Sequence, residues 1–176
     1  MKDILRKLKL IDNLTTDLEI SRTEFVEKLS AITDRGDTGM FSDTFDVFSS
    51  SKNELKGQVN FEGFKLKRRR RFFDTNLNMA VASGTINEHN GHLTIESEIN
   101  GFNNFFIVFY IFLIVFYSFF IFGFGSSDNN MEFFAIPFLI LHGTLMFSIP
   151  YFMMRRSVKR LKYELEREFF YLTKQK

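Results

Sequence analysis

The sequence contains no cysteine, no tryptophan and only two prolines among its 176 residues. The absence of cysteine excludes disulfides, cysteine-ligated metals and thiol chemistry. Phosphate-binding glycine loops, His-Glu-x-x-His motifs and nucleophile elbows are also missing. We therefore predict that the protein is not an enzyme, and we expect no catalytic residue, no cofactor and no metal site. The many Phe, Asn and Lys residues indicate a bacterium with AT-rich coding.

Charged residues are missing from two long stretches, 99–127 and 133–154. A membrane-spanning helix needs about 20 mostly apolar residues, and both stretches are long enough. The alternative is a soluble protein with two apolar core helices, but so short a chain has little material to cover them. We therefore predict a transmembrane hairpin. It comprises residues 101–154, with spans at about 102–124 and 132–154 and a short external loop at 125–131.

The flanks of these two stretches predict the orientation of the chain. No Lys or Arg lies between them, whereas a basic cluster follows the second stretch. The cluster at this membrane exit consists of Arg155, Arg156, Lys159 and Arg160. Because cytoplasmic flanks carry the excess of Lys and Arg, we expect a multi-pass protein of the cell inner (plasma) membrane with both termini in the cytoplasm.

Residues 1–100 precede the hairpin and are expected to fold as a small cytoplasmic α+β domain. Ser21 begins a Ser-x-x-Glu capping box, which is typical of a helix start. Short alternating segments follow from residue 40, including a predicted strand at 44–48. The dipeptide Asn90-Gly91 favours a tight turn between two antiparallel strands. The predicted fold is thus an antiparallel β-meander with one or two helices, then the transmembrane hairpin, then a C-terminal helix.

That C-terminal helix is predicted over residues 155–176 and is amphipathic. Its apolar residues recur at steps of three and four, which places them on one helical face. They are Val158, Leu161, Leu165, Phe169 and Leu172. The sequence leaves open whether this face covers the sheet, a partner helix or the bilayer surface.

A strongly basic segment lies on a predicted strand after residue 63. Its candidate binding residues are Lys65, Lys67, Arg68, Arg69, Arg70 and Arg71. One interpretation is a patch for anionic headgroups, since each Lys or Arg near such a surface contributes about 1 kcal/mol. The second is a charged edge strand that pairs with the domain's own carboxylates. An acidic protein partner is the third, and nucleic acid is not expected.

His142 lies near the middle of the second apolar stretch, where ionisable residues are rare and often functional. Counting outward from the loop places it about one helical turn from Tyr110. In one interpretation a neutral imidazole bonds Tyr110, Thr144 or a carbonyl and holds two helices together. In the other, His142 serves proton or ligand transport.

The segment 64–76, followed by Ala80–Ile86 and a strand that enters a Phe-rich stretch, resembles small uncharacterised bacterial membrane proteins. The resemblance covers residues 50–125 and implies a cytoplasmic β-rich module beside a two-helix anchor. The arrangement is also loosely similar to proteins that combine a pleckstrin-homology-like sheet with a membrane hairpin, although here the sheet comes first. Neither resemblance implies an activity or a functional residue.

These features predict a non-enzymatic, membrane-anchored binding or accessory module that acts as a scaffold. Its expected partners are the lipid bilayer, anionic headgroups, and another membrane protein or a second copy of the chain. The alternative is a small transport or channel component that works as an oligomer, with His142 facing a shared interior.

Overall fold

The computed structural model describes residues 1–39, 42, 51–70, 78–89, 91–125 and 132–174. The predicted strand at 44–48, the loop at 126–131, Asn90 and Arg71 lie outside these residues. The fold class is α+β, with a six-stranded sheet and C-terminal helices. The chain forms two compact units: a sheet unit of residues 1–102 with 154–176, and a helical unit of residues 103–153.

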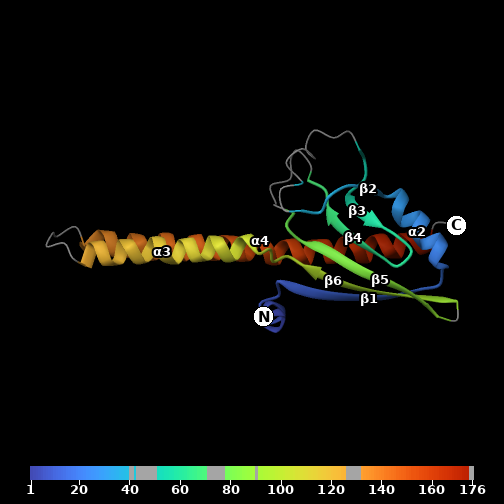
Figure 1. Cartoon of the computed structure of the whole chain (residues 1–176), viewed down its shortest axis with the longest axis horizontal. Coiled ribbons are helices and arrows are strands. Elements are labelled where there is room, and N and C mark those ends of the chain that lie inside the picture. Colours follow the sequence, from blue (N-terminus) through green and yellow to red (C-terminus); the bar gives the residue numbers. More distant parts are fainter. Residues whose placement is uncertain (40–41, 43–50, 71–77, 90, 126–131, 175–176) are drawn as a thin grey trace. The chain divides into compact units, whose positions relative to one another are not determined.

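The sheet unit is built on one sheet, and its strands follow each other in the order β1-β6-β5-β4-β3-β2 (Figure 1). Their bounds are β1 Ile11–Leu18, β2 Thr33–Arg35, β3 Leu55–Val59, β4 Gly63–Arg68, β5 Val81–His89 and β6 His92–Asn100. Strands β3 to β6 are consecutive antiparallel neighbours, which confirms the predicted meander. Strand β1 extends it antiparallel to β6, while the short β2 pairs parallel to β3.

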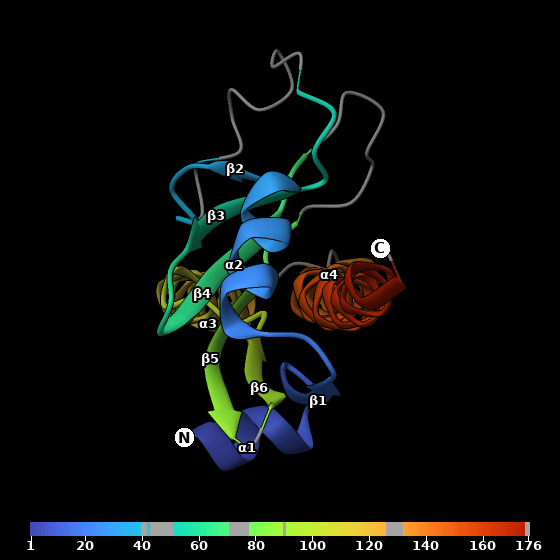
Figure 2. The same ribbon diagram turned by 90° about the vertical axis from the view of Figure 1, so that its right-hand side faces the viewer.

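Two short helices belong to the sheet unit, α1 (Lys2–Lys7) and α2 (Arg22–Ala31). The predicted cap of α2 is present, because Ser21 Oγ accepts a hydrogen bond from the backbone N–H of Glu24 at 3.2 Å. Helix α2 buries Phe25, Val26 and Leu29 against the core. In the end-on view, α2 and the C-terminal part of the last helix lie on the same side of the sheet (Figure 2).

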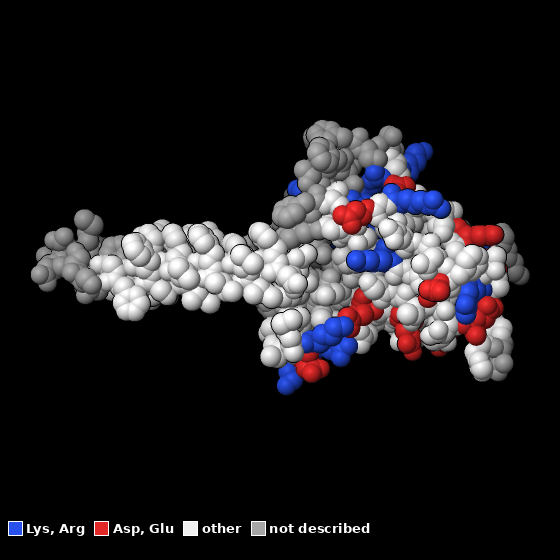
Figure 3. Space-filling model, viewed as in Figure 1, with Lys and Arg blue, Asp and Glu red and all other residues white. Residues whose placement is uncertain are grey.

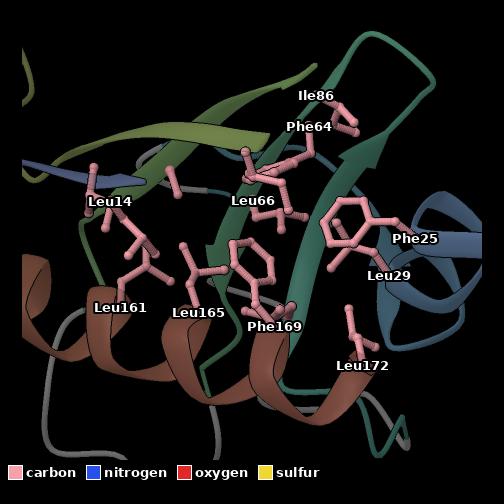
Figure 4. Packing of buried hydrophobic residues seen from close by; sticks show 14 of the residues in the cluster. Leu14, Phe25, Leu29, Phe64, Leu66, Ile86, Leu161, Leu165, Phe169 and Leu172 are labelled. Atoms are coloured by element: carbon pink, nitrogen blue, oxygen red, sulfur yellow. The ribbon is translucent and has the colours of Figure 1, made fainter. Parts of the chain in front are cut away.

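The last helix, α4 (Glu132–Lys174), joins the sheet unit from Met154 onward. The predicted apolar stripe is buried there: Val158, Leu161, Leu165, Phe169 and Leu172 are each at most 2% exposed. All five belong to one cluster with residues of the sheet and α2. Figure 4 shows Leu161, Leu165, Phe169 and Leu172 pointing into this cluster. Of the three surfaces that the sequence left open, the stripe therefore covers the sheet.

Gly101 shows how tightly α4 packs where the chain leaves β6. A Cβ atom at this position would lie 2.5 Å from Val158 Cγ2 and 3.0 Å from the Met154 carbonyl oxygen. The Gly101 N–H also donates to the Leu10 carbonyl at 2.9 Å. Glycine is required here because backbone and helix approach too closely for a side chain.

The helical unit contains α3 (Phe105–Gly125) and the first part of α4. Both helices are long and apolar enough to cross a membrane, judged by length and composition. They contact each other through Tyr110, whose ring stacks on Phe147 with centroids 5.6 Å apart. The Tyr110 hydroxyl donates to the Phe147 carbonyl at 3.3 Å.

Candidate functional site

The basic segment predicted as a surface patch is β4, which lies inside the sheet between β5 and β3. The edge position is therefore wrong, but the other part of that interpretation, pairing with the protein's own carboxylates, holds for Arg68 and Arg69. Leu66 of this strand is buried in the core, and Lys65 is exposed. Lys67 is only 1% exposed, and its Nζ donates to the Gly39 carbonyl at 3.0 Å.

Arg68 is buried on the opposite face, where it meets helix α4. Its Nε lies 2.7 Å from Glu164 Oε1, and both side chains are less than 10% exposed. Arg160 Nε approaches the same carboxylate oxygen at 3.3 Å. Burial raises the pKa of Glu164, although the charges of Arg68 and Arg160 oppose this. The cluster joins β4 to α4 within the protein.

Arg69 forms an ion pair with Asp34, beside β3 and β2. Asn53 donates to the same Asp34 carboxylate at 2.9 Å, and the Asn78 amide donates to the Arg69 carbonyl at 3.1 Å. Arg70 is half-buried. The burial of Lys67, Arg68 and Arg69 corrects the prediction that this strand presents them to headgroups.

A different set of cations meets at the β1 edge of the sheet unit, where a groove of about 620 Å³ lies between β1 and α4. We call it the cationic groove. Its basic lining residues are Arg6, Lys9, Arg155, Lys159 and Lys162. Among the described residues, two acidic side chains, Asp12 and Glu166, line it as well, so this lining has a formal charge of +3. Elsewhere on the sheet unit, basic and acidic side chains are interspersed over the face in view (Figure 3).

The cations of the groove differ in whether a carboxylate neutralises them. Lys162 Nζ lies 2.9 Å from Asp12, and Arg6 lies 3.2 Å from Glu98. Lys9, Arg155 and Lys159 form no ion pair with any residue that the structure describes. These three side chains remain available to an anion.

The sequence identified this groove only in part. Arg155 and Lys159 belong to the predicted membrane-exit cluster, but Arg156 is exposed elsewhere on the helix and Arg160 pairs with Glu164. The spacing of Arg155, Lys159 and Lys162 at steps of four and three is the signal for one helical face. The contribution of Arg6 and Lys9 was missed, because it depends on how the N-terminal segment packs beside α4.

Two polar residues of the helical unit also form a pair. The Tyr117 hydroxyl lies 2.6 Å from His142 Nδ1. The sequence predicted Tyr110 as the neighbour of His142, but Tyr110 bonds the Phe147 carbonyl, and Thr144 bonds the Ile140 carbonyl of its own helix. The predicted pairing of positions was offset by about one helical turn, so Tyr117 was missed.

Metal ligands do not gather in the part of the chain that the structure describes, where no group of three His, Cys, Asp or Glu residues could hold an ion. No protein-family model, curated protein or solved structure matches the chain. Function must therefore be inferred from the residues themselves.

Proposed function

We propose that the protein is a non-enzymatic, membrane-anchored binding or accessory module. In this proposal α3 and the first part of α4 cross the inner membrane as a hairpin, and the sheet unit lies in the cytoplasm. The observation that carries it is the apolar surface of the helical unit. Phe119 and Phe122 of α3 are 76% and 77% exposed, and Leu141 of α4 is 62% exposed.

Such exposure is unfavourable in water, at about 25 cal/mol for each Å² of apolar surface. The same side chains are stable in hydrocarbon, where Leu, Ile, Phe and Val each favour insertion by roughly 0.3 to 0.6 kcal/mol. On the face in view, the described surface of α3 carries no charged side chain (Figure 3). A bilayer is therefore the environment that these helices fit best.

The sheet unit is made of segments from both sides of the helical unit, and this supports a hairpin over a single crossing. Residues 1–102 and 154–176 pack into one unit around one core. A folded core cannot be divided by a bilayer, so the chain must return to the side that it left. The basic residues from Arg155 onward favour the cytoplasm as that side.

Single-cysteine labelling tests the proposal directly, because the natural chain has no cysteine. We expect a membrane-impermeant maleimide to label Asp128→Cys in spheroplasts, and Lys7→Cys only after permeabilisation. Both variants should stay in the membrane after alkaline carbonate extraction. Release by carbonate would refute the anchor, and labelling of Lys7→Cys in sealed spheroplasts would refute the orientation.

The alternative of an oligomeric transport component gains no support from His142. A relay needs a series of groups that exchange protons, and one His with one Tyr does not make a pathway. Here Nδ1 is already bonded to Tyr117 at 2.6 Å. This contact fits a role in joining two helices.

A further inference from the structure

We propose that the cationic groove binds the phosphate-bearing headgroup of an anionic phospholipid. This inference rests on the proposed membrane anchor and adds a specific ligand site to it. The basic strand β4, which the sequence favoured for this role, is buried and bonded within the protein. In the groove, by contrast, three cations lie together without a carboxylate partner among the described residues.

The charges of the groove suit one phosphodiester. Asp12 is neutralised by Lys162, which leaves Lys9, Arg155 and Lys159 without a carboxylate partner among the described residues. An arginine donates two parallel hydrogen bonds to phosphate oxygens, and lysines add point charges around it. An anion placed there would form the ion pairs that these three side chains lack with the described part of the chain.

The position of the groove along the chain favours a lipid as the source of that phosphate. Arg155 comes three residues after the exposed apolar Phe152, and Lys159 comes seven after it. These separations are one and two helical turns. If the apolar helices cross the bilayer, both side chains fall at the headgroup layer, where anionic phosphates are concentrated.

The size and lining of the groove also favour a headgroup over a free ion. Its volume of about 620 Å³ falls within the range of small-molecule sites. Ile11, Val158 and Tyr163 line it beside the cations and offer apolar contact. Inorganic phosphate would leave most of this space empty, whereas a glycerol backbone with the start of its acyl chains would fill it.

The test uses the full chain in a mild uncharged detergent. Three probes are titrated separately: short-chain phosphatidylglycerol, short-chain phosphatidylcholine and inorganic phosphate, with binding measured by calorimetry. We expect phosphatidylglycerol to bind at least about tenfold more tightly than either other probe. Equal binding of the two lipids would overturn the proposal. Phosphate that binds as tightly as phosphatidylglycerol would also overturn it, because the site would then recognise a free anion.

Two triple variants with the same loss of charge locate the site. Lys9→Gly with Arg155→Gln and Lys159→Gln removes the available cations of the groove. Lys7→Gln with Lys65→Gln and Arg156→Gln removes three exposed cations that do not line it. We expect about a tenfold loss of phosphatidylglycerol affinity in the first variant and less than a twofold loss in the second.

Unchanged binding in the groove variant, or equal losses in both, would overturn the proposal. Circular dichroism must show that both variants are folded. Carbonate extraction of the same variants tests the membrane anchor independently of the lipid site. A groove variant that loses lipid binding and stays in the membrane supports both proposals. If the wild-type chain resists extraction but binds the two lipids equally, the membrane anchor is supported and the lipid site is refuted.

Discussion

The Arg68–Glu164 pair is buried at the junction of β4 and α4. Two charges removed from water lose hydration, and their attraction offsets this only while both are present. The pKa of Glu164 is raised even with Arg68 and Arg160 beside it. Burying the ionised carboxylate therefore lowers the free energy of unfolding. The pair is therefore a better determinant of how α4 aligns on the sheet than of the total stability.

We predict that Arg68→Gln destabilises the protein by about 3 kcal/mol, because it leaves a buried carboxylate short of positive charge. Folded Glu164 has a higher pKa than unfolded Glu164, so its ionisation lowers stability as the pH rises between those two values. Without Arg68 this pKa rises further. The loss should thus be larger at pH 8 than at pH 5, measured by thermal unfolding with circular dichroism in detergent.

The exposed Arg156→Gln provides the control for this measurement and should change stability by no more than about 0.5 kcal/mol. A destabilisation by Arg68→Gln that does not depend on pH would contradict the assignment of the effect to Glu164.

Lys9 adopts a backbone conformation that disfavours most side chains, with φ at 57° where α1 ends. Glycine reaches this region without steric strain, and a β-branched residue is the least compatible. We predict that Lys9→Gly keeps or raises the stability, by up to about 1 kcal/mol, whereas Lys9→Val lowers it. Thermal unfolding of the two variants checks this. A clear loss of stability in Lys9→Gly would mean that the Lys9 side chain itself supports the fold.

At the scale of elements, the C-terminal part of α4 completes the core of the sheet unit. Phe169 is fully buried, with its ring centroid 5.5 Å from Phe25 and 5.8 Å from Phe64 in edge-to-face contacts. Polar bonds fix the helix along its length: Ser157 Oγ accepts from the Ala80 N–H at 2.9 Å, and Lys28 Nζ donates to the Leu172 carbonyl at 2.9 Å.

We predict that Phe169→Ala lowers the free energy of unfolding by about 3 to 5 kcal/mol, because it opens a cavity between three elements. Tyr163 on the same helix is 65% exposed, and Tyr163→Ala should change the free energy of unfolding by less than about 0.5 kcal/mol. Denaturant unfolding of both variants gives the comparison. Equal effects would show that the stripe does not pack on the sheet.

Helix α1 is attached to the sheet by charge. Lys2 and Arg6 lie 2.8 and 3.2 Å from Glu98 of β6, and the hydrogen bond from Lys2 is the largest cause that lowers the pKa of Glu98. A lowered folded pKa contributes stability above the unfolded pKa, and that contribution disappears as the pH falls through the folded one. The side chains are partly exposed, so solvent screening keeps the effect to about 0.2–1 kcal/mol.

We therefore predict that α1 detaches in acid before the sheet unfolds. Hydrogen exchange of the α1 amides should accelerate as the pH falls below the ordinary pKa of glutamate, after correction for the intrinsic pH dependence of exchange. Glu98→Gln should show the fast exchange already at neutral pH. Protection of α1 that is the same in this variant would contradict the role of Glu98.

Sequence patterns within a single helix or strand predicted the features that depend on neighbouring residues of the chain. The cap at Ser21, the alternation of β6 and the stripe on α4 each depend on residues within one element, and each was found. The burial of the basic side chains of β4 could not be predicted in this way. The run of basic residues indicates an exposed strand, and only the long-range pairings of Arg68 with Glu164 and of Arg69 with Asp34 explain its burial. The prediction of the cationic groove was incomplete for the same reason, since Lys9 and Arg155 are 146 positions apart in the sequence.

At the scale of the whole molecule, the sheet unit is interrupted in sequence by the helical unit. Residues 1–102 end close to where α4 re-enters the core, because a Cβ at Gly101 would lie 3.0 Å from the Met154 carbonyl oxygen. A short connection can therefore replace the whole insertion. The core residues on both sides of it already contact one another.

We predict that a chain in which four Gly or Ser residues replace residues 103–153 folds as a soluble domain. It retains both parts of the core and loses the apolar surface assigned to the bilayer, so it should remain in the supernatant after membranes are sedimented. Circular dichroism and a cooperative thermal transition measure its folding, and Leu165→Asp in the same chain is the control that should abolish the transition. A shortened chain that unfolds or aggregates while its secondary structure is lost would show that the helices support the sheet, and the division between anchor and module would then be wrong.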